Sequence, residues 1–120
     1  EFLRQHEKIA WVQYCGLPGD KYYELGQKYL PNGSCGVVSF GVKGGRTAAE
    51  TFMGRLKIAA IETHVADART CCLHPASSTH RQMNAEELRA AGVPEDLVRY
   101  SCGLEDAEDL IADLAQALAF

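Results

Sequence analysis

The sequence predicts a small α/β (α+β) fold, in which helices pack on a sheet of about four strands. Two observations lead to this prediction. Short β-prone runs alternate with segments whose apolar residues recur at helical spacing, and turn signals containing glycine or proline separate them. The length of 120 residues is enough for one hydrophobic core, and no linker or repeat divides it. We therefore expect a single domain over residues 1–120.

Three runs rich in β-branched and aromatic residues predict strands at 9–14, 36–42 and 98–102. The turn signals CGLPGD and KGG follow the first two runs. The apolar segment 58–62 either extends the preceding helix or forms another strand. Between His64 and His80 the composition is typical of a loop, interrupted by the short run CCL.

Apolar stripes and capping signals predict the end of one helix at 2–7 and further helices at 20–29, 46–57, 84–92 and 104–118. Asp20 is expected to cap the second of these, and Asn84 forms a capping box with Glu87. Glu105 and Asp106 stand at the amino end of the last helix, where the helix dipole favours negative charge. The predicted core-facing stripes are Tyr22, Leu25 and Tyr29; Ala49, Phe52, Met53 and Leu56; and Ala107, Leu110, Ile111, Leu114 and Leu118.

Charge and hydropathy indicate which partners are not expected. The net charge of −4 provides no basic surface for nucleic acid or an anionic membrane. No apolar run approaches the roughly 20 residues of a membrane span. The first residues, EFLRQHEK, lack the apolar core of a secretory signal. We expect a cytoplasmic protein.

The five cysteines are an odd number without a recurring spacing, which favours reduced thiols. Cys71, Cys72, His74 and His80 suggest a metal cluster, but their spacing matches no zinc module. In an extended segment the two adjacent cysteines would also point to opposite faces. We therefore expect no metal, with Cys72 in the core and Cys71 partly exposed.

Arg99 is the most informative charged residue. In LVRYSCG, strand alternation places Leu97, Arg99 and Ser101 on one face and the intervening residues on the other. A buried guanidinium there needs an anionic partner, and its planar fork suits a carboxylate held by two hydrogen bonds. The pattern leaves two partners open: the carboxylate of a ligand, or an acidic side chain of this chain in an internal salt bridge.

Two other segments carry weaker signals. Lys43-Gly44-Gly45 suggests a phosphate loop or a Schiff-base lysine, but the phosphate-loop pattern GxxxxGK[ST] is absent. A strand-ending turn with a solvated lysine is the preferred interpretation. Segment 74–80, HPASSTH, is small and polar, as is typical of a loop that lines a site and also of an ordinary surface loop. Neither of its histidines has an identifiable carboxylate partner.

Four segments carry a resemblance to a known family: KIAWVQYCGL, YLPNGSCGVVSFGVKGG, HPASSTHRQM and GVPEDLVRYSCGLEDAEDLIADLAQAL. From His6 to Leu118 the chain resembles the carboxyl-terminal part of the cysteine/methionine-metabolism class of pyridoxal-phosphate enzymes. The segments KYLPNG, SFGVKGG and THRQM are most similar in sequence to the O-acetylhomoserine sulfhydrylase branch. The resemblance implies a mostly antiparallel sheet, in the C-terminal domain of a fold-type I enzyme.

The resemblance also implies a site that is only partly contained in this chain. Pyridoxal phosphate and its Schiff-base lysine would belong to a larger amino-terminal domain that is absent here, so we expect no catalytic or cofactor-binding residue in the chain. Arg99 matches the arginine that binds the substrate α-carboxylate. His64 matches the position of a second carboxylate contact, and Thr63 beside it matches a position that shapes substrate choice. Ala66 departs from the usual glycine of this loop.

In function, the resemblance implies that the full-length enzyme makes homocysteine from O-acetylhomoserine and sulfide, a step of methionine biosynthesis. The expected partners are these substrates, the N-terminal domain of the same enzyme and further copies in a homotetramer, and the chain alone would be inert. Two alternatives remain: a cystathionine synthase or γ-lyase of the same family, or a stand-alone binding module that has lost the chemistry.

Overall fold

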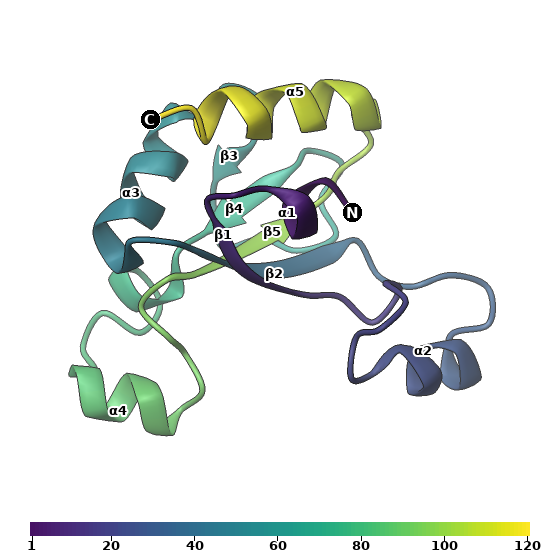
Figure 1. Cartoon of the computed structure of the whole chain (residues 1–120), viewed down its shortest axis with the longest axis horizontal. Helices are drawn as coiled ribbons and strands as arrows, with labels where there is room; N and C mark the ends of the chain where they lie inside the picture. The colour runs from purple at the N-terminus through teal and green to yellow at the C-terminus, as the bar shows by residue number, and fades with distance from the viewer.

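A five-stranded sheet forms the centre of the computed structural model, which describes all residues from Glu1 to Phe120 (Figure 1). The strand order is β1-β2-β5-β4-β3. The strands are β1 (Ile9–Gln13), β2 (Val37–Val42), β3 (Ala60–Ile61), β4 (Cys71–Leu73) and β5 (Leu97–Ser101). The helices are α1 (Phe2–Gln5), α2 (Tyr23–Tyr29), α3 (Gly45–Arg55), α4 (Ala85–Ala90) and α5 (Ala107–Ala117), with a short 3-10 helix, η1, at Pro75–Ser77.

The predicted fold class is confirmed. All neighbouring strands pair antiparallel except β3 and β4, which pair in parallel. The sheet has five strands instead of about four, because the ambiguous apolar segment 58–62 contributes the two-residue strand β3 and the run CCL forms β4. Both lie on the side of β5 away from β2, so β5 occupies the middle of the sheet.

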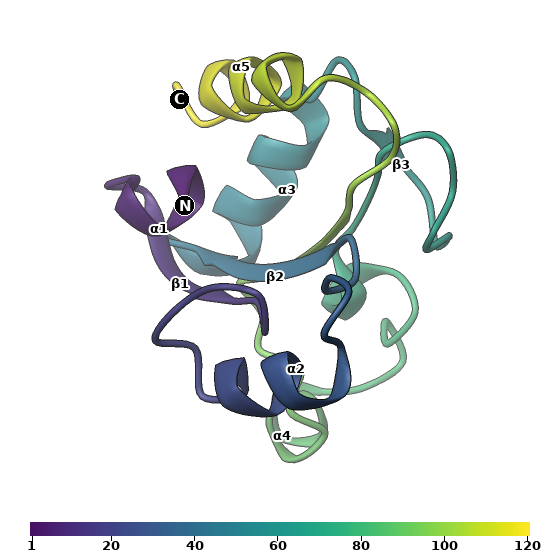
Figure 2. The same cartoon turned by 90° about the vertical axis from the view of Figure 1, so that its right-hand side faces the viewer.

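The core lies on one face of the sheet. Helices α1, α3 and α5 cover this face, whereas α2 and α4 lie on the opposite side (Figure 2). Phe40 of β2 and Phe52 of α3 are fully buried, and their rings meet edge to face at 5.7 Å. Val98 and Tyr100 of β5 point into the same core. Strand alternation therefore turns Arg99, between them, to the other face.

The stripe predicted on α2 does not face the core. Tyr22, Leu25 and Tyr29 are 45%, 52% and 67% exposed. The buried residue of this helix is Gly26, where an added Cβ would lie 2.9 Å from the carbonyl oxygen of Cys15. Because α2 approaches the rest of the chain through this glycine, its larger side chains are turned outward.

The predicted cap of α2 is also wrong. The N-cap residue of this helix is Tyr22, and no side chain caps it. The carboxylate of Asp20 accepts hydrogen bonds from the backbone amides of Tyr14 and Tyr22, at 2.9 and 2.8 Å, and so closes the preceding turn. The capping box of Asn84 and Glu87 at α4 is present as predicted.

Helix α5 begins at Ala107 with Asp106 as its N-cap, and its buried face differs from the predicted stripe. Leu110, Leu114 and Leu118 are buried as expected, but Ile111 is 43% exposed and Ala107 is exposed. On the buried face, Asp113 takes the place expected for Ile111 and Ala107. Its carboxylate accepts hydrogen bonds from the backbone amides of Lys57 and Ile58, each at 2.9 Å. A charged side chain thus anchors α5 to the segment that leads into β3.

Asp113 predicts a pH dependence of stability. Burial raises the pKa of this carboxyl, but hydrogen bonds from Ile58, Lys57, Gln116 and Ala59 outweigh the burial and leave the pKa below its ordinary value. A lowered native pKa stabilises the fold above the unfolded pKa of about 4, and this contribution disappears as the pH falls through the native value.

We expect Asp113→Asn to reduce the free energy of unfolding by about 1–3 kcal/mol at neutral pH. The difference from the wild type should shrink below about pH 4. Urea unfolding at pH 7 and pH 3 measures both effects. Asp109→Asn, an exposed residue of the same helix, is the matched control. Equal losses in the two variants at pH 7 would contradict the role of Asp113.

Cys72 lies in the core as predicted, but Cys71 is not partly exposed: both are buried, at 0% and 1% exposure. The loop that precedes β4 covers the second face of this strand, and the Cys71 thiol lies 3.3 Å from the carbonyl oxygen of Arg69. Burial raises the pKa of the Cys72 thiol to about 12. All five thiols are free. No helix has the length and apolar character needed to cross a bilayer.

Candidate functional site

Arg99 stands in the middle of β5, opposite Ser39 of β2 and Leu73 of β4. Its Nη2 donates to the backbone carbonyl oxygens of Thr63, at 2.6 Å, and His64, at 3.3 Å. Its Nε is buried and has no hydrogen-bond partner. A buried donor without a partner is rare in folded proteins, so the hydrogen-bonding capacity of this guanidinium is not fully used by the chain.

The internal salt bridge that the sequence left open is not formed. The ion pairs within the chain are Arg46 with Glu50, and His64 with Glu62 and Asp67. Arg99 takes part in none of them. A half-buried guanidinium that contacts only carbonyl oxygens has no counter-charge within the chain, which favours an anion from outside the chain.

Thr63 and His64 lie beside Arg99 in the segment 62–70, which connects β3 to β4 and is called the β3–β4 loop below. Both side chains are exposed, and their backbone carbonyls are what contact the guanidinium. The His64 ring turns toward acidic neighbours, with Nδ1 2.9 Å from a carboxylate oxygen of Glu62 and 3.9 Å from one of Asp67. The structure thus brings the three predicted site residues together, with Nε2 of His64 left for an outside partner.

Ala66 has a φ of 57°, in the left-handed region. It is the alanine that replaces a glycine in the resemblance. The loop therefore keeps a backbone conformation that suits glycine, despite the substitution. The amide of Ala66 donates to the hydroxyl of Ser101 at 3.2 Å, and this contact holds the strained residue against the end of β5.

We expect Ala66→Gly to increase the free energy of unfolding by about 0.5–1 kcal/mol. The left-handed conformation costs an alanine roughly 1–2 kcal/mol, and the greater freedom of glycine in the unfolded chain cancels part of the gain. Urea unfolding measures the change. Ala68→Gly in the same loop is the control and should be neutral or destabilising, because Ala68 has no positive φ. A loss of stability in Ala66→Gly would show that the alanine is not strained.

Glu105 has a role that its place in the sequence did not reveal. It precedes the N-cap of α5, and its carboxylate accepts hydrogen bonds from the amide and the hydroxyl of Thr70, at 2.9 and 2.6 Å. The Thr70 hydroxyl lowers the pKa of this carboxyl most, followed by backbone hydrogen bonds. Thr70 is fully buried. Nothing in the sequence indicated that Thr70 and Glu105 are in contact. By contrast, strand alternation had already placed Ser101 on the same face as Arg99.

The first part of the HPASSTH segment, from His74 to Ser78, makes structural contacts. His74 is buried, with its ring nitrogens 2.7 Å from the Ser77 hydroxyl and 2.7 Å from the carbonyl oxygen of Glu95. Both nitrogens are used, so the ring fixes η1 against the segment before β5. Ser78 donates to the carbonyl oxygen of His74 at 2.6 Å. These contacts favour a packing role over a site-lining role.

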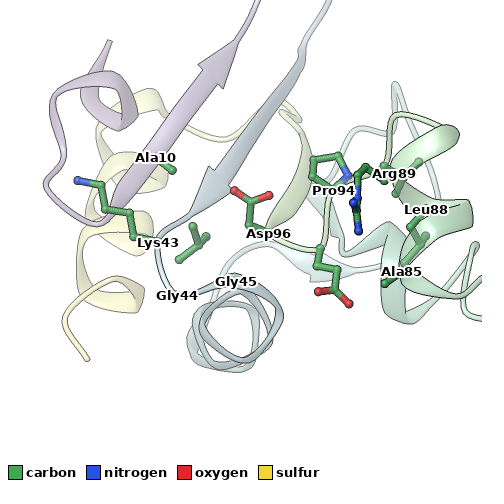
Figure 3. A pocket seen from close by; sticks show the side chains of 12 residues that line it. Ala10, Lys43, Gly44, Gly45, Ala85, Leu88, Arg89, Pro94 and Asp96 are labelled. Carbon is green, nitrogen blue, oxygen red and sulfur yellow. The ribbon is translucent and has the colours of Figure 1, made fainter.

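Lys43 ends β2 in a turn, as predicted, with Gly44 and Gly45 at φ values of 104° and 68°. The turn borders a hollow of about 400 Å³. Figure 3 shows Lys43 with its ammonium directed away from Asp96, another residue of the lining. Glu95 also lines the hollow. Lys43 and Arg89 are balanced by Glu95 and Asp96 in this lining, so the hollow offers no net positive charge to an anionic phosphate ester.

The β-sheet, the arginine on its central strand and the surrounding loop agree with one class of proteins. Residues 1–119 match the family described as Cys/Met metabolism PLP-dependent enzyme. The chain therefore belongs to this family of pyridoxal-phosphate-dependent enzymes.

Among individual proteins, the chain is 45% identical over 118 residues to O-acetyl-L-homoserine sulfhydrylase 1 of Thermus thermophilus, covering 98% of this chain and 28% of the relative. It is 44% identical to an L-methionine gamma-lyase of Treponema denticola, covering 98% of this chain and 29% of the relative. A crystal structure of a putative O-acetylhomoserine (thiol)-lyase from Campylobacter jejuni matches with a TM-score of 0.90 and 36% identity.

That match covers 99% of this chain and 28% of the Campylobacter chain, whose structure contains an N'-pyridoxyl-lysine-5'-monophosphate. The present chain thus spans under a third of the length of the proteins it resembles.

Proposed function

We propose that the chain is the C-terminal domain of a pyridoxal-phosphate-dependent O-acetylhomoserine sulfhydrylase. The full-length enzyme would convert O-acetylhomoserine and sulfide to homocysteine and acetate, a step of methionine biosynthesis. The observation that carries the proposal is the half-buried guanidinium of Arg99 on the central strand, which has no acidic partner within the chain. The similarity to the Thermus sulfhydrylase supports the choice of reaction.

In this proposal Arg99 binds the α-carboxylate of the amino-acid substrate. Its Nη2 is held by the carbonyl oxygens of Thr63 and His64, which fixes the plane of the guanidinium. The two N–H donors of Nη1, which have no partner in the chain, are then available to the substrate carboxylate in a fixed orientation. A carboxylate held this way fixes the direction of the bonds at the α-carbon, which is where positioning increases the rate.

His64 is proposed as the second contact to the carboxylate. Its Nδ1 is hydrogen bonded to Glu62, and Nε2 has no partner in the chain. If Nδ1 carries the proton that Glu62 accepts, Nε2 donates only when the ring is protonated as well. Thr63, exposed beside it, is proposed to contact the part of the substrate beyond the carboxylate.

We propose that pyridoxal phosphate is not held by the residues of this chain. Lys43 lines the hollow described above, where Glu95 and Asp96 balance its charge and that of Arg89. We assign the cofactor and its lysine to the remainder of the full-length enzyme, where the cofactor would supply an electron sink for the reaction. The chain by itself is then inert, and its partners are the N-terminal domain and further copies in a homotetramer.

A second candidate is a γ-lyase or cystathionine synthase of the same family. The identity of 44% to the Treponema L-methionine gamma-lyase favours this alternative, because it nearly equals the identity to the Thermus sulfhydrylase. Arg99 would have the same role in either enzyme, since both act on an α-amino acid. Thr63 and the chemistry outside this chain would then decide the reaction.

Purified full-length protein separates the candidates. Incubation with O-acetylhomoserine and sulfide should yield homocysteine and acetate in equal amounts, and incubation with methionine alone should release little methanethiol. Methanethiol release from methionine at a comparable rate would favour the lyase. If the natural reading frame carries no upstream domain, or if neither substrate reacts, the stand-alone binding module becomes the better interpretation.

A further inference from the structure

The β3–β4 loop has no apolar anchor of its own. From Thr63 to Arg69 every residue is exposed, and the first buried residue after them is Thr70. Burial of apolar surface, the usual means of holding a segment in place, is therefore not available to the part of the loop that contacts Arg99. The position of the Thr63 and His64 carbonyls must be fixed in another way.

Hydrogen bonds to the segment after β5 provide that fixation. The amide of Leu104 donates to the carbonyl oxygen of Ala68 at 2.8 Å, and the amide of Gly103 donates to the Thr70 hydroxyl at 2.8 Å. The Thr70 hydroxyl in turn donates to Glu105 at 2.6 Å, and the Thr70 amide to the same carboxylate at 2.9 Å. Hydrogen bonds to an ionised carboxylate are roughly twice as strong as those between neutral groups.

Close backbone contact supports the same attachment. An added Cβ at Gly103 would collide with the carbonyl oxygen of Ala68 and with the backbone of Arg69 and Thr70. Two backbone segments that approach this closely cannot move apart without losing the hydrogen bonds between them. The segment 102–105 continues directly from β5, so a single stretch of chain carries Arg99 and the groups that hold the loop beside it.

We propose that Thr70 and Glu105 are positioning residues for the substrate carboxylate: they hold the β3–β4 loop so that the carbonyls of Thr63 and His64 orient the guanidinium of Arg99. This inference rests on the proposed function and extends it to residues that do not touch the substrate. Glu105 acts through Thr70, and Thr70 acts through the loop. Ser101 adds a weaker contact through the amide of Ala66.

The test uses the full-length enzyme and a matched pair at one position. Thr70→Val keeps the shape of the side chain but removes the hydroxyl, whereas Thr70→Ser keeps the hydroxyl and loses a methyl group. We expect Thr70→Val to raise KM for O-acetylhomoserine about tenfold, with kcat changed less than threefold, because uniform substrate binding is lost. Thr70→Ser should stay within about twofold of the wild type. Glu105→Gln, which loses the charge, should resemble Thr70→Val.

Hydrogen–deuterium exchange of the peptide covering 62–70 gives a second readout that does not depend on activity. Exchange should be faster in Thr70→Val than in Thr70→Ser. If both Thr70 variants shift KM alike, or if the loop exchanges faster while KM is unchanged, the residues are merely structural and the inference is wrong. If the wild type makes no homocysteine, the proposed function fails, and the exchange rates of the same pair then decide whether Thr70 holds the loop.

Discussion

Arg99→Ala in the full-length enzyme is expected to raise KM for O-acetylhomoserine roughly 100-fold, with pyridoxal-phosphate content unchanged. The loss of a bidentate, charge-assisted contact is worth about 3 kcal/mol, and each 1.4 kcal/mol is a factor of about ten. The cofactor content should stay normal because the contacts of the Arg99 side chain are to Thr63 and His64, and the proposed function assigns the cofactor to the rest of the full-length enzyme. Steady-state kinetics and the absorbance of the bound cofactor measure both quantities.

Two further variants sharpen this experiment. Arg99→Lys keeps the charge but not the planar fork, so its KM should lie between those of the wild type and the alanine variant. Arg46→Ala removes an exposed arginine that pairs with Glu50 on α3 and should leave KM unchanged. An unchanged KM in Arg99→Ala would mean that the guanidinium serves the fold and not the substrate. A loss of cofactor together with the rise in KM would mean that the variant disturbs more than the carboxylate contact.

Phe52→Ala is expected to have the largest effect on stability, a loss of about 3–5 kcal/mol in the free energy of unfolding. Phe52 is fully buried and meets Phe40 edge to face at 5.7 Å, at the point where α3 packs on β2. Removal of the ring loses its transfer free energy and leaves a cavity between helix and sheet. For a domain of this size the total stability is about 5–15 kcal/mol, so the variant is expected to lose a large share of it.

Phe120→Ala is the matched control, since the same side chain is removed at a position that is 39% exposed. Its ring lies 4.1 Å from the ammonium of Lys8, a contact worth about 0.5–1 kcal/mol at exposed sites. Urea unfolding followed by circular dichroism compares the two variants. A loss of less than about 1.5 kcal/mol in Phe52→Ala would indicate that the core repacks and that this aromatic pair is not central to it.

The sequence predicted the sheet better than the surfaces of the helices. β1, β2 and β5 were found because β-prone runs bounded by turn signals follow from strand geometry alone. The outward face of α2 was missed because Leu25 and Tyr29 have helical spacing whether or not a neighbour covers them. Only the approach of Gly26 to the carbonyl of Cys15 decides which side of the helix faces the chain, and that contact is tertiary.

In the candidate site too, features that depend on local sequence were predicted and features that depend on distant contacts were not. Arg99 could be identified because a charged residue in an apolar strand is unusual within a local window. Whether an acidic side chain of the same chain pairs with Arg99 depends on residues far away in sequence. The structure shows no such ion pair. The hydrogen bonds between Thr70 and Glu105 span 35 positions, so no local pattern indicates them. The resemblance marked Ala66 as the place of a usual glycine, but alanine itself gives no sign of a positive φ, so only the structure shows that the left-handed backbone is kept.

The exposed stretch from Thr63 to Arg69 also affects how the protein can evolve. Its side chains take no part in the core, and its course is fixed from outside by backbone contacts to the end of β5 and by Thr70. Substitutions there can change the surroundings of Arg99 while the hydrophobic core remains intact. Selection could therefore explore new substrate preferences in this stretch at little cost in folding, as long as Thr70, Gly103 and Glu105 are retained.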